Sequence, residues 1–292
     1  MKVGFVTHPG REIALAATAR LRETLGAEGV ETMGLPDDGE QLGRAAEGLD
    51  LVVSVGGDGT FLRAAFAASD AGCPVLGVKV GRMGFLTEVE PDGAEALIRS
   101  VLAGTARIEE RLALTTEPID GESFLPQWGL NEVMVVKRAR HRLIRLAVEV
   151  DGIYVTTFSA DGVIVASPTG STAYSFSARG PIVGPDVDCM VLTPIAAHMV
   201  FDRSFVLSAR SHVQLEVVGD ESGILSADGR QSIELPVGSR VRIRASGRPA
   251  RLVRREEAPG FLSLVREKFG LPGTREDERG DADVGIDVGS GD

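Results

Sequence analysis

The segment 51–68 constrains the fold most strongly, because it joins three structural signals without a gap. Its first five residues are mostly apolar and rich in valine, which favours a buried strand of a parallel sheet. We expect Gly56, Gly57 and Gly59 to form a tight turn that only glycine makes at low cost. The residues that follow are good helix formers. A strand, a turn and a helix start bring backbone N–H groups and a positive helix end to one point, where phosphates bind.

Asp58 stands out among these glycines because a carboxylate repels phosphate. An acid at this place suggests a group that accepts a proton or holds a hydroxyl beside the phosphate. The alternative is an ordinary strand–turn–helix connection in which Asp58 caps the helix. The segment has neither the Gly-Lys-Ser/Thr ending of a Walker loop nor the third glycine of the dinucleotide fingerprint. Asp58 is therefore our candidate catalytic residue.

The composition limits the kinds of partner. The chain has 292 residues and a formal net charge of −11, which argues against non-specific binding to nucleic acid or to anionic membranes. Cys73 and Cys189 lack CxxC or zinc spacing, and the histidines lack ligand-like spacing, so we expect no metal site. No signal peptide or apolar run of transmembrane length is present in the sequence, and we expect a cytoplasmic protein.

Hydrophobic periodicity divides the chain into two domains. Strand-like runs alternate with helical spacing in residues 1–107, which predicts an α/β domain with a parallel sheet. Short alternating runs fill residues 108–255 and predict a β-rich domain, with a hairpin at Asp151-Gly152. Residues 261–269 predict an amphipathic helix that packs back on the first domain. Residues 273–292 are acidic and glycine-rich, which predicts a disordered tail.

Two further motifs lie in the β-rich region. Asn131-Glu132 begins a strand, and the run from Pro168 to Tyr174 follows the apolar residues 163–166. That run supplies hydroxyls, a flexible glycine, N–H groups and an aromatic ring in one short stretch. By itself, the Asn–Glu pair indicates capping or solvation. The second motif by itself indicates a polar turn.

Together, the motifs resemble those of the NAD kinase family, whose members phosphorylate the 2′-hydroxyl of the adenosine ribose of NAD. Gly-Gly-Asp-Gly-Thr alone resembles a wider superfamily that includes diacylglycerol-type lipid kinases and, more distantly, phosphofructokinases. The ordered set covers roughly residues 1 to 270 and consists of 56–60, Gly77 with Gly84-Phe85-Leu86, Asn131-Glu132, Asp161-Gly162, 168–174 and Asp228-Gly229.

The resemblance implies a Rossmann-like α/β N-terminal domain, a β-sandwich-like C-terminal domain that carries most NAD contacts, and a site between them. It implies ATP or polyphosphate as the donor, Mg²⁺ arriving with ATP, and a homodimer or homotetramer with shared sites. Asp58 would then accept the proton. Asn131 and Glu132 would hold the adenosine and ribose hydroxyls, while Asp161 and Ala196 would lie near the nicotinamide end.

The other expected contacts fall into three groups. We expect backbone or side-chain contacts to phosphate from Gly56, Gly57, Gly59, Thr60 and Arg63. The resemblance places Thr172, Ala173, Tyr174, Ser175, Phe176 and Ser177 around the adenosine, and it matches Arg142 and Arg230 to further NAD contacts. Three positions depart from the family pattern, namely Lys79, Met83 and Ser159.

Two rival functions remain open. A lipid kinase of the same superfamily would share the Asp58 motif, but it would not need Asn131-Glu132 or the motif ending at Tyr174. A non-catalytic NADP-binding regulator on the same scaffold is a rival of another class, and the intact Asp58 argues against it. Turnover of NAD, NADH and diacylglycerol with ATP would separate these functions.

Overall fold

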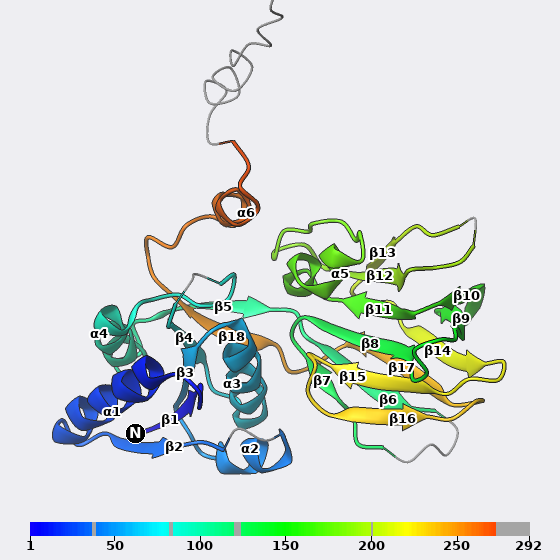
Figure 1. The fold of residues 1–292 in the computed structure, drawn as a ribbon. Coiled ribbons are helices and arrows are strands. Elements are labelled where there is room, and N and C mark those ends of the chain that lie inside the picture. The colour runs from blue at the N-terminus through cyan, green and yellow to red at the C-terminus, as the bar shows by residue number, and fades with distance from the viewer. Residues whose placement is uncertain (37–38, 82–83, 120–123, 200, 273–292) are drawn as a thin grey trace, which may run out of the picture. The chain divides into compact units, whose positions relative to one another are not determined.

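The computed structural model describes residues 1–36, 39–81, 84–119, 124–199 and 201–272. These residues form two compact units, Met1–Glu256 and the part that begins at Glu257. Within the described residues, the larger unit contains three six-stranded sheets (Figure 1). One of them belongs to an α/β layer, and the other two form a β-rich region.

The α/β layer is built on a sheet of order β2-β1-β3-β4-β18-β5, in which β5 alone runs antiparallel to its neighbour. Its elements are β1 (Lys2–Thr7), α1 (Glu12–Ala27), β2 (Glu31–Gly34), α2 (Gly39–Ala45), β3 (Leu51–Gly56), α3 (Asp58–Ala71), β4 (Val75–Lys79), α4 (Pro91–Leu102), β5 (Arg107–Arg111) and β18 (Ala250–Arg254).

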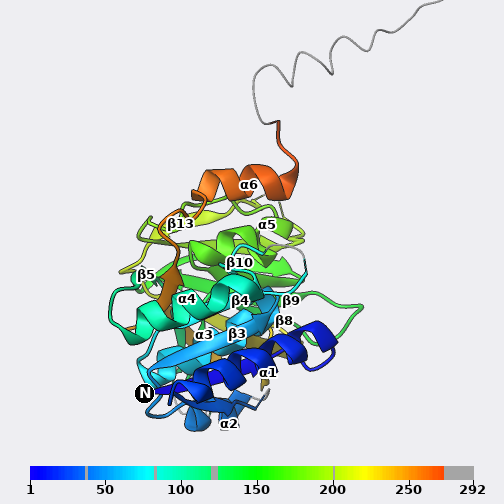
Figure 2. The same cartoon turned by 90° about the vertical axis from the view of Figure 1, so that its left-hand side faces the viewer.

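Helices cover both faces of this sheet: in Figure 1, α1 and α4 lie on one side of it and α3 lies on the other, and Figure 2 looks onto the face that α1 and α4 cover. Apolar side chains of α1 and α4 pack on one face in a cluster that includes Leu51 and Val53 of β3. Side chains of α2 and α3 pack on the other face with Val52. Because β3 is buried on both faces, its sequence is mostly apolar and does not alternate between apolar and polar residues.

The strand order reverses beside β3. β1 pairs in parallel with β2 on one side and with β3 on the other. The carboxyl ends of β1 and β3 therefore form a topological switch point, where open α/β sheets commonly bind ligands. The glycine-rich segment with Asp58 leaves the sheet at this point.

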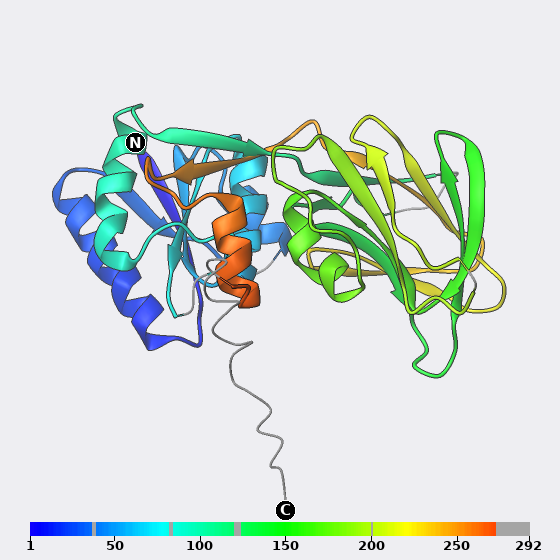
Figure 3. The same cartoon turned by 90° about the horizontal axis from the view of Figure 1, so that it is seen from above.

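The β-rich region consists of two antiparallel sheets, which confirms the expected sandwich (Figure 3). One has the order β10-β9-β14-β17-β6-β7, with strands β6 (Leu114–Pro118), β7 (Trp128–Gly129), β9 (Ile144–Val150), β10 (Ile153–Ala160), β14 (Val213–Val218) and β17 (Arg240–Ala245). The other has the order β13-β12-β11-β8-β15-β16, with strands β8 (Glu132–Lys137), β11 (Gly162–Ala166), β12 (Cys189–Ile195), β13 (Phe205–Ser208), β15 (Gly223–Ala227) and β16 (Ser232–Leu235). One apolar core receives side chains from both sheets.

The two regions are joined by strands that the sequence assigned differently. The boundary expected after residue 107 falls inside β5, and β18 was expected in the β-rich domain. Both strands instead belong to the first sheet, where β18 pairs with β4 and β5. Short strands have the same alternation in either sheet, so the pattern could not show that the chain returns to the α/β layer.

Two local predictions are confirmed. β9 and β10 form an antiparallel hairpin, and Asp151 and Gly152 have φ of 53° and 80°, as a tight primed turn requires. The helix expected over 261–269 is α6 (Phe261–Phe269), in the smaller unit. Its packing on the first domain stays a prediction. The tail 273–292 lies outside the described residues.

Candidate functional site

Asp58 lies in the first turn of α3, and the helix N-cap is Gly57. The Asp58 carboxylate makes no capping bond. It accepts hydrogen bonds from the backbone N–H of Phe85 at 3.1 Å and of Leu86 at 3.4 Å. The capping interpretation is therefore wrong, because this side chain is directed to a loop that follows β4.

Gly84 makes the approach of this loop possible. A Cβ at position 84 would lie 1.8 Å from Oδ1 of Asp58, which no real side chain tolerates. The Gly84 N–H donates to Oγ1 of Thr87 at 3.3 Å, which closes the loop on itself. The carboxylate is thus held by 84–86 in a fixed orientation while remaining half-exposed.

The three glycines around Asp58 differ from the sequence expectation. None of them has a positive φ, and Gly57 is extended, with φ of −104° and ψ of −171°. The turn therefore does not need a conformation reserved for glycine, because β3 runs almost directly into α3. Gly56 is required for space, since its Cβ would meet Oγ1 of Thr60 at 2.6 Å. Positions 57 and 59 have no atom within 4 Å of a Cβ and leave open space at the helix start.

Asn131 and Glu132 are held by Asp228, a half-buried residue with φ of 51° in the turn after β15. Its carboxylate accepts backbone N–H groups from Leu130 at 2.7 Å, Asn131 at 2.9 Å and Glu132 at 3.1 Å. Three donors on one carboxylate fix the chain where β8 begins.

Glu132 carries the most perturbed electrostatics of the site. Burial, followed by the nearby Asp228 charge, raises the pKa of Glu132 to about 8, against a smaller opposing effect from the Tyr174 N–H. Burial also raises the pKa of Asp228. The Oε2 atom of Glu132 is buried and has no hydrogen-bond partner. A buried oxygen in this state is costly unless a ligand supplies a donor.

The motif that begins at Pro168 packs directly on this pair. It forms a short 3₁₀ helix, η1 (Thr169–Thr172), and then α5 (Tyr174–Ser177). A Cβ on Gly170 would lie 2.0 Å from the Asn131 carbonyl oxygen, so glycine lets the two segments touch. The Ser167 N–H donates to the same carbonyl at 2.8 Å.

The adenosine-contact candidates in this motif face different surroundings. Tyr174 and Phe176 are exposed aromatic side chains, whereas Ser175 is buried, with its hydroxyl 3.2 Å from that of Thr193. Thr172 and Ala173 are half-buried, and Ser177 is exposed. The rings of Tyr174 and Phe176 offer stacking surfaces, whereas the Ser175 side chain is held inside the protein.

The Asp58 and Glu132 segments rest on one apolar cluster. It contains Phe61 of α3, Trp128, Leu130 and Leu86. Leu86 belongs to the Asp58 loop, which consists of residues 84–86 and holds the Asp58 carboxylate. The Arg248 carbonyl also accepts a bond from the Trp128 indole at 2.9 Å. Sequence elements far apart in the chain therefore meet between α3 and β7, at the junction of the two regions.

Comparison with known proteins identifies this arrangement. Residues 3–106 match the model of the ATP-NAD kinase N-terminal domain, and residues 130–255 match that of the C-terminal domain. NAD kinase 2 of Streptomyces avermitilis is 39% identical, over 92% of this chain and 94% of that protein. NAD kinase of Mycobacterium tuberculosis is 38% identical, over 92% of this chain and 95% of that protein. The chain belongs to the ATP-NAD kinase family.

Solved structures of related proteins share the fold. Yeast NADH kinase complexed with NADH superposes with a TM-score of 0.82 at 24% identity, covering 94% of this chain and 89% of that one. An NAD kinase from Archaeoglobus fulgidus in complex with ATP has a TM-score of 0.71 at 28% identity, covering 92% and 97%. Family membership makes this chain a phosphotransferase.

A second group of expected contacts lies elsewhere on the same strands. In the β8–β11 pair, Ala166 is opposite Glu132, and Gly162 is opposite Val136. Asp161, which precedes β11 and lies level with Lys137, is thus about 17 Å along the strands from Glu132, at roughly 3.4 Å per residue. The Asp161 carboxylate pairs with Lys137. The Asp161 backbone N–H donates to the carbonyl of Ile195, the residue before Ala196.

Arg142 also lies toward that end, in the loop after β8. Its guanidinium is exposed and pairs with Glu221 at 2.8 Å. One chain therefore presents the family's expected contacts as two groups. The first surrounds Asp58 and Glu132, and the second contains Arg142, Asp161 and Ala196.

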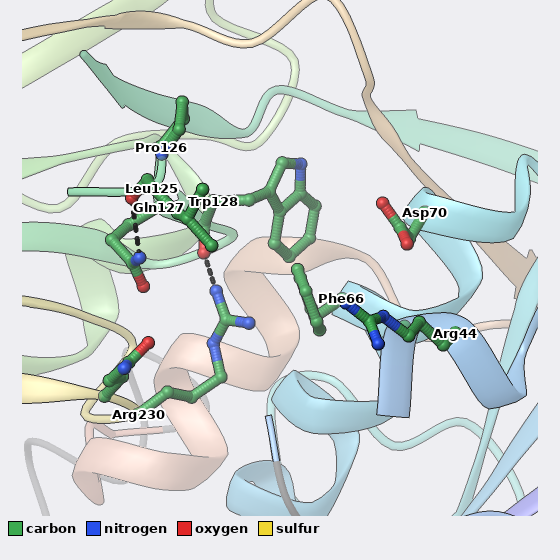
Figure 4. A pocket seen from close by; sticks show the side chains of 10 residues that line it. Arg44, Phe66, Asp70, Leu125, Pro126, Gln127, Trp128 and Arg230 are labelled. Atoms are coloured by element: carbon green, nitrogen blue, oxygen red, sulfur yellow. Dashed lines mark hydrogen bonds between the residues drawn. The ribbon is translucent and has the colours of Figure 1, made fainter. Parts of the chain in front are cut away.

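Arg230 faces a cavity of about 260 Å³ between α3 and the segment before β8 (Figure 4). Its guanidinium carbon lies 4.0 Å from the centroid of the Phe66 ring, and its Nη2 donates to the Trp128 carbonyl. Burial lowers the pKa of Arg230, and the Asp228 charge opposes that effect. Contact of Arg230 with NAD stays a prediction.

The remaining candidates and departures are placed as follows. Arg63 is half-buried one turn into α3, and Thr60 is buried. Lys79 pairs with Glu90 at 2.9 Å, and the Ser159 carbonyl accepts the His198 N–H. Met83 lies outside the described residues. Among the residues described, no group of three or more His, Cys, Asp or Glu side chains could hold a metal ion.

Across the described part of the chain, no helix is long and apolar enough to span a bilayer.

The structure adds functional residues that the sequence left without a role. Asp228 fixes the start of β8, and the 84–86 backbone orients Asp58. Both segments belong to the motif set, so the motifs were the available signal. Phe85 and Asp58 are 27 positions apart in the sequence, and Asn131 and Asp228 are 97 positions apart. A local sequence pattern cannot indicate contacts over such separations.

Proposed function

We propose that Asp58 accepts the proton of the NAD 2′-hydroxyl as the γ-phosphoryl group of ATP is transferred to that oxygen. The new bond joins the ribose oxygen to phosphorus, the bond from that phosphorus to the ADP oxygen breaks, and the proton passes to Asp58. The observation that carries this proposal is the restraint of the Asp58 carboxylate by two N–H donors at a helix start. A carboxylate offers about four lone-pair positions, so acceptor capacity remains for the substrate hydroxyl.

The donor phosphates are expected at the N-terminus of α3. The open space beside Gly57 and Gly59 lets a phosphate approach the backbone N–H groups, and the helix dipole favours its charge there. Arg63, one turn farther, is a candidate phosphate contact. Mg²⁺ would enter as part of the ATP complex, since this ion usually binds through one or two carboxylates and substrate phosphates. Asp58 is the acid at the helix start that fits such a complex.

The ribose is expected beside Glu132. The Oε2 atom of Glu132, which is buried and has no hydrogen-bond partner, can accept a bond from a ribose hydroxyl. Asn131 adds a side-chain amide at the start of the same strand. Tyr174 and Phe176 provide exposed rings for the adenine. Binding of the ribose would thus satisfy an oxygen that the free protein leaves without a partner.

The assay that tests this function measures NADP formed from NAD with ATP and Mg²⁺. We expect turnover with NAD and none with diacylglycerol. Parallel reactions with polyphosphate and with NADH define donor and acceptor range. Phosphorylation of diacylglycerol in place of NAD would overturn the proposal, and so would NADP binding without turnover by the intact chain.

The second group of contacts favours a homo-oligomer, as a dimer or tetramer, in which Asp161 of one copy serves the site of another. Mixing two weakened variants tests this arrangement. If sites are shared, Asp58→Asn and Asp161→Asn chains that have exchanged subunits form some sites with both native acids, and activity returns. Activity that never exceeds the average of the separate variants would show that each chain builds its own site. Light scattering gives the oligomer size.

A further inference from the structure

The α/β layer and the β-rich region are connected by two strands, each of which carries buried charge. The chain leaves the α/β layer through β5 and enters β6, and it returns from β17 into β18. Arg111 ends β5, and Arg254 ends β18; their side chains are 9% and 8% exposed. Charged side chains of this kind are rarely buried unless they are paired.

Arg254 joins acids from two elements. Its Nη1 lies 2.7 Å from Oε2 of Glu88, and its Nε lies 3.2 Å from Oε2 of Glu109. The Glu88 side chain is only 3% exposed and also accepts the Arg255 backbone N–H at 2.9 Å. Glu88 follows the Asp58 loop by two residues, so this end of the network is tied to the proton acceptor.

Arg111 continues the network to the substrate side. Its Nε pairs with the Glu109 carboxylate, and its Nη1 donates to the hydroxyl of Thr169 at 3.3 Å. Thr169 begins η1, and the next residue, Gly170, packs on the Asn131 carbonyl. The contacts therefore run without a break from the Asp58 loop to the ribose-binding pair.

We infer that Glu88, Arg254, Glu109, Arg111 and Thr169 form a positioning network that sets the distance between Asp58 and the Asn131–Glu132 pair. The inference rests on the proposed function of those two groups. Buried ion pairs add little net stability compared with apolar side chains of similar volume, but they fix geometry when every partner is satisfied. A proton acceptor displaced by about 1 Å can lose about 100-fold in rate, so geometry is what such a network would protect.

Two single variants probe the ends of the network. Arg254→Lys keeps the charge but cannot reach both acids with a planar fork. Thr169→Val keeps the shape and removes the hydroxyl, and Thr169→Ser should restore it. We expect Arg254→Lys and Thr169→Val each to lower kcat/KM for NAD roughly 2- to 30-fold. Arg251→Lys is the matched control on the same strand, because the Arg251 guanidinium donates to the Gly72 carbonyl at 3.3 Å instead of to an acid of the network.

The double variant Arg254→Lys/Thr169→Val decides whether the ends act together. If they belong to one network, breaking the second end adds little, and the combined loss is clearly smaller than the product of the single losses. A combined loss equal to that product would overturn the inference. A lowered Tm with unchanged kcat and KM would do the same, because it indicates a structural role alone.

Amide hydrogen exchange gives a readout that does not depend on catalysis. Thr169→Val should raise exchange in residues 84–87 as well as around η1, whereas Arg251→Lys should change neither. Exchange that changes only near residue 169 would refute the network even in an active enzyme. A wild-type chain that fails to phosphorylate NAD would instead refute the proposed function, while the exchange result would still decide on the network.

Discussion

Asp58 and Glu132 are both acids at the start of a regular element, and the protein treats them in opposite ways. Asp58 is half-exposed at the start of α3, and its carboxylate is held by two backbone N–H groups. Glu132 starts β8, is buried, and has one oxygen without a partner. The orientation of Asp58 is therefore set before substrate binds. Glu132 lacks a donor that the substrate can supply, so the first residue suits chemistry and the second suits recognition.

Asp58→Asn is expected to have the largest effect. Asparagine keeps the size of the side chain and one acceptor oxygen but cannot take up a proton. Turnover should fall about 10²- to 10⁴-fold, the usual contribution of a general base. Steady-state kinetics measure this loss. Asp92→Asn is the control, because Asp92 is also an acid in the first turn of a helix but is exposed and pairs with Arg20. More than about a tenth of wild-type turnover in Asp58→Asn would exclude the base role.

Gly84→Ala tests whether the fixed orientation of Asp58 matters. The added Cβ would meet Oδ1 at 1.8 Å, so the carboxylate or the loop must move. We expect kcat to fall by about 10- to 100-fold, as for a misplaced catalytic group. Gly247→Ala is the control, because a Cβ there meets nothing within 4 Å. Equal kcat in both variants would mean that Asp58 does not need this loop.

These two residues show how far sequence reasoning extends. The strand–turn–helix unit around Asp58, the Asp151-Gly152 hairpin and α6 are encoded locally, so periodicity and turn residues predict them. Family membership followed from the order of the motifs. The partners of Asp58, the role of Asp228 and the place of β18 depend on contacts between distant positions. The prediction of a tight turn that only glycine makes at low cost was wrong, because none of the three glycines beside Asp58 has a positive φ and Gly56 is instead required for space.

Glu132→Gln sharpens the comparison through both binding and stability. Replacing the Glu132 carboxyl group by an amide should raise the KM for NAD by about 5- to 150-fold, equivalent to about 1–3 kcal/mol. An unchanged KM would remove Glu132 from the ribose site. Glu234→Gln is the control, because Glu234 lies in the same sheet but is exposed.

The pH dependence of stability provides a second test of Glu132. Its pKa of about 8 in the folded chain exceeds the reference value of 4.5, so the folded state keeps a proton that the unfolded state loses. Wild-type stability should therefore fall as pH rises from about 4.5 to 8, whereas Glu132→Gln lacks this contribution. We expect the Tm of the variant to exceed that of the wild type increasingly over that window. Parallel Tm curves would contradict the raised pKa.

Gly59→Ala should have the smallest effect and addresses the open space beside Asp58. Gly59 in α3 and Gly26 in α1 are both helical glycines with nothing within 4 Å of a Cβ. Alanine at either position should therefore leave the protein folded and stabilise it slightly, by about 0.4–1 kcal/mol. The variants Gly59→Ala and Gly26→Ala should differ only in their kinetics with ATP. If phosphate approaches the backbone at the start of α3, the new methyl at position 59 should raise the KM for ATP a few-fold, whereas Gly26→Ala should not change it. Identical ATP kinetics for the two variants would place the donor phosphates away from this helix start.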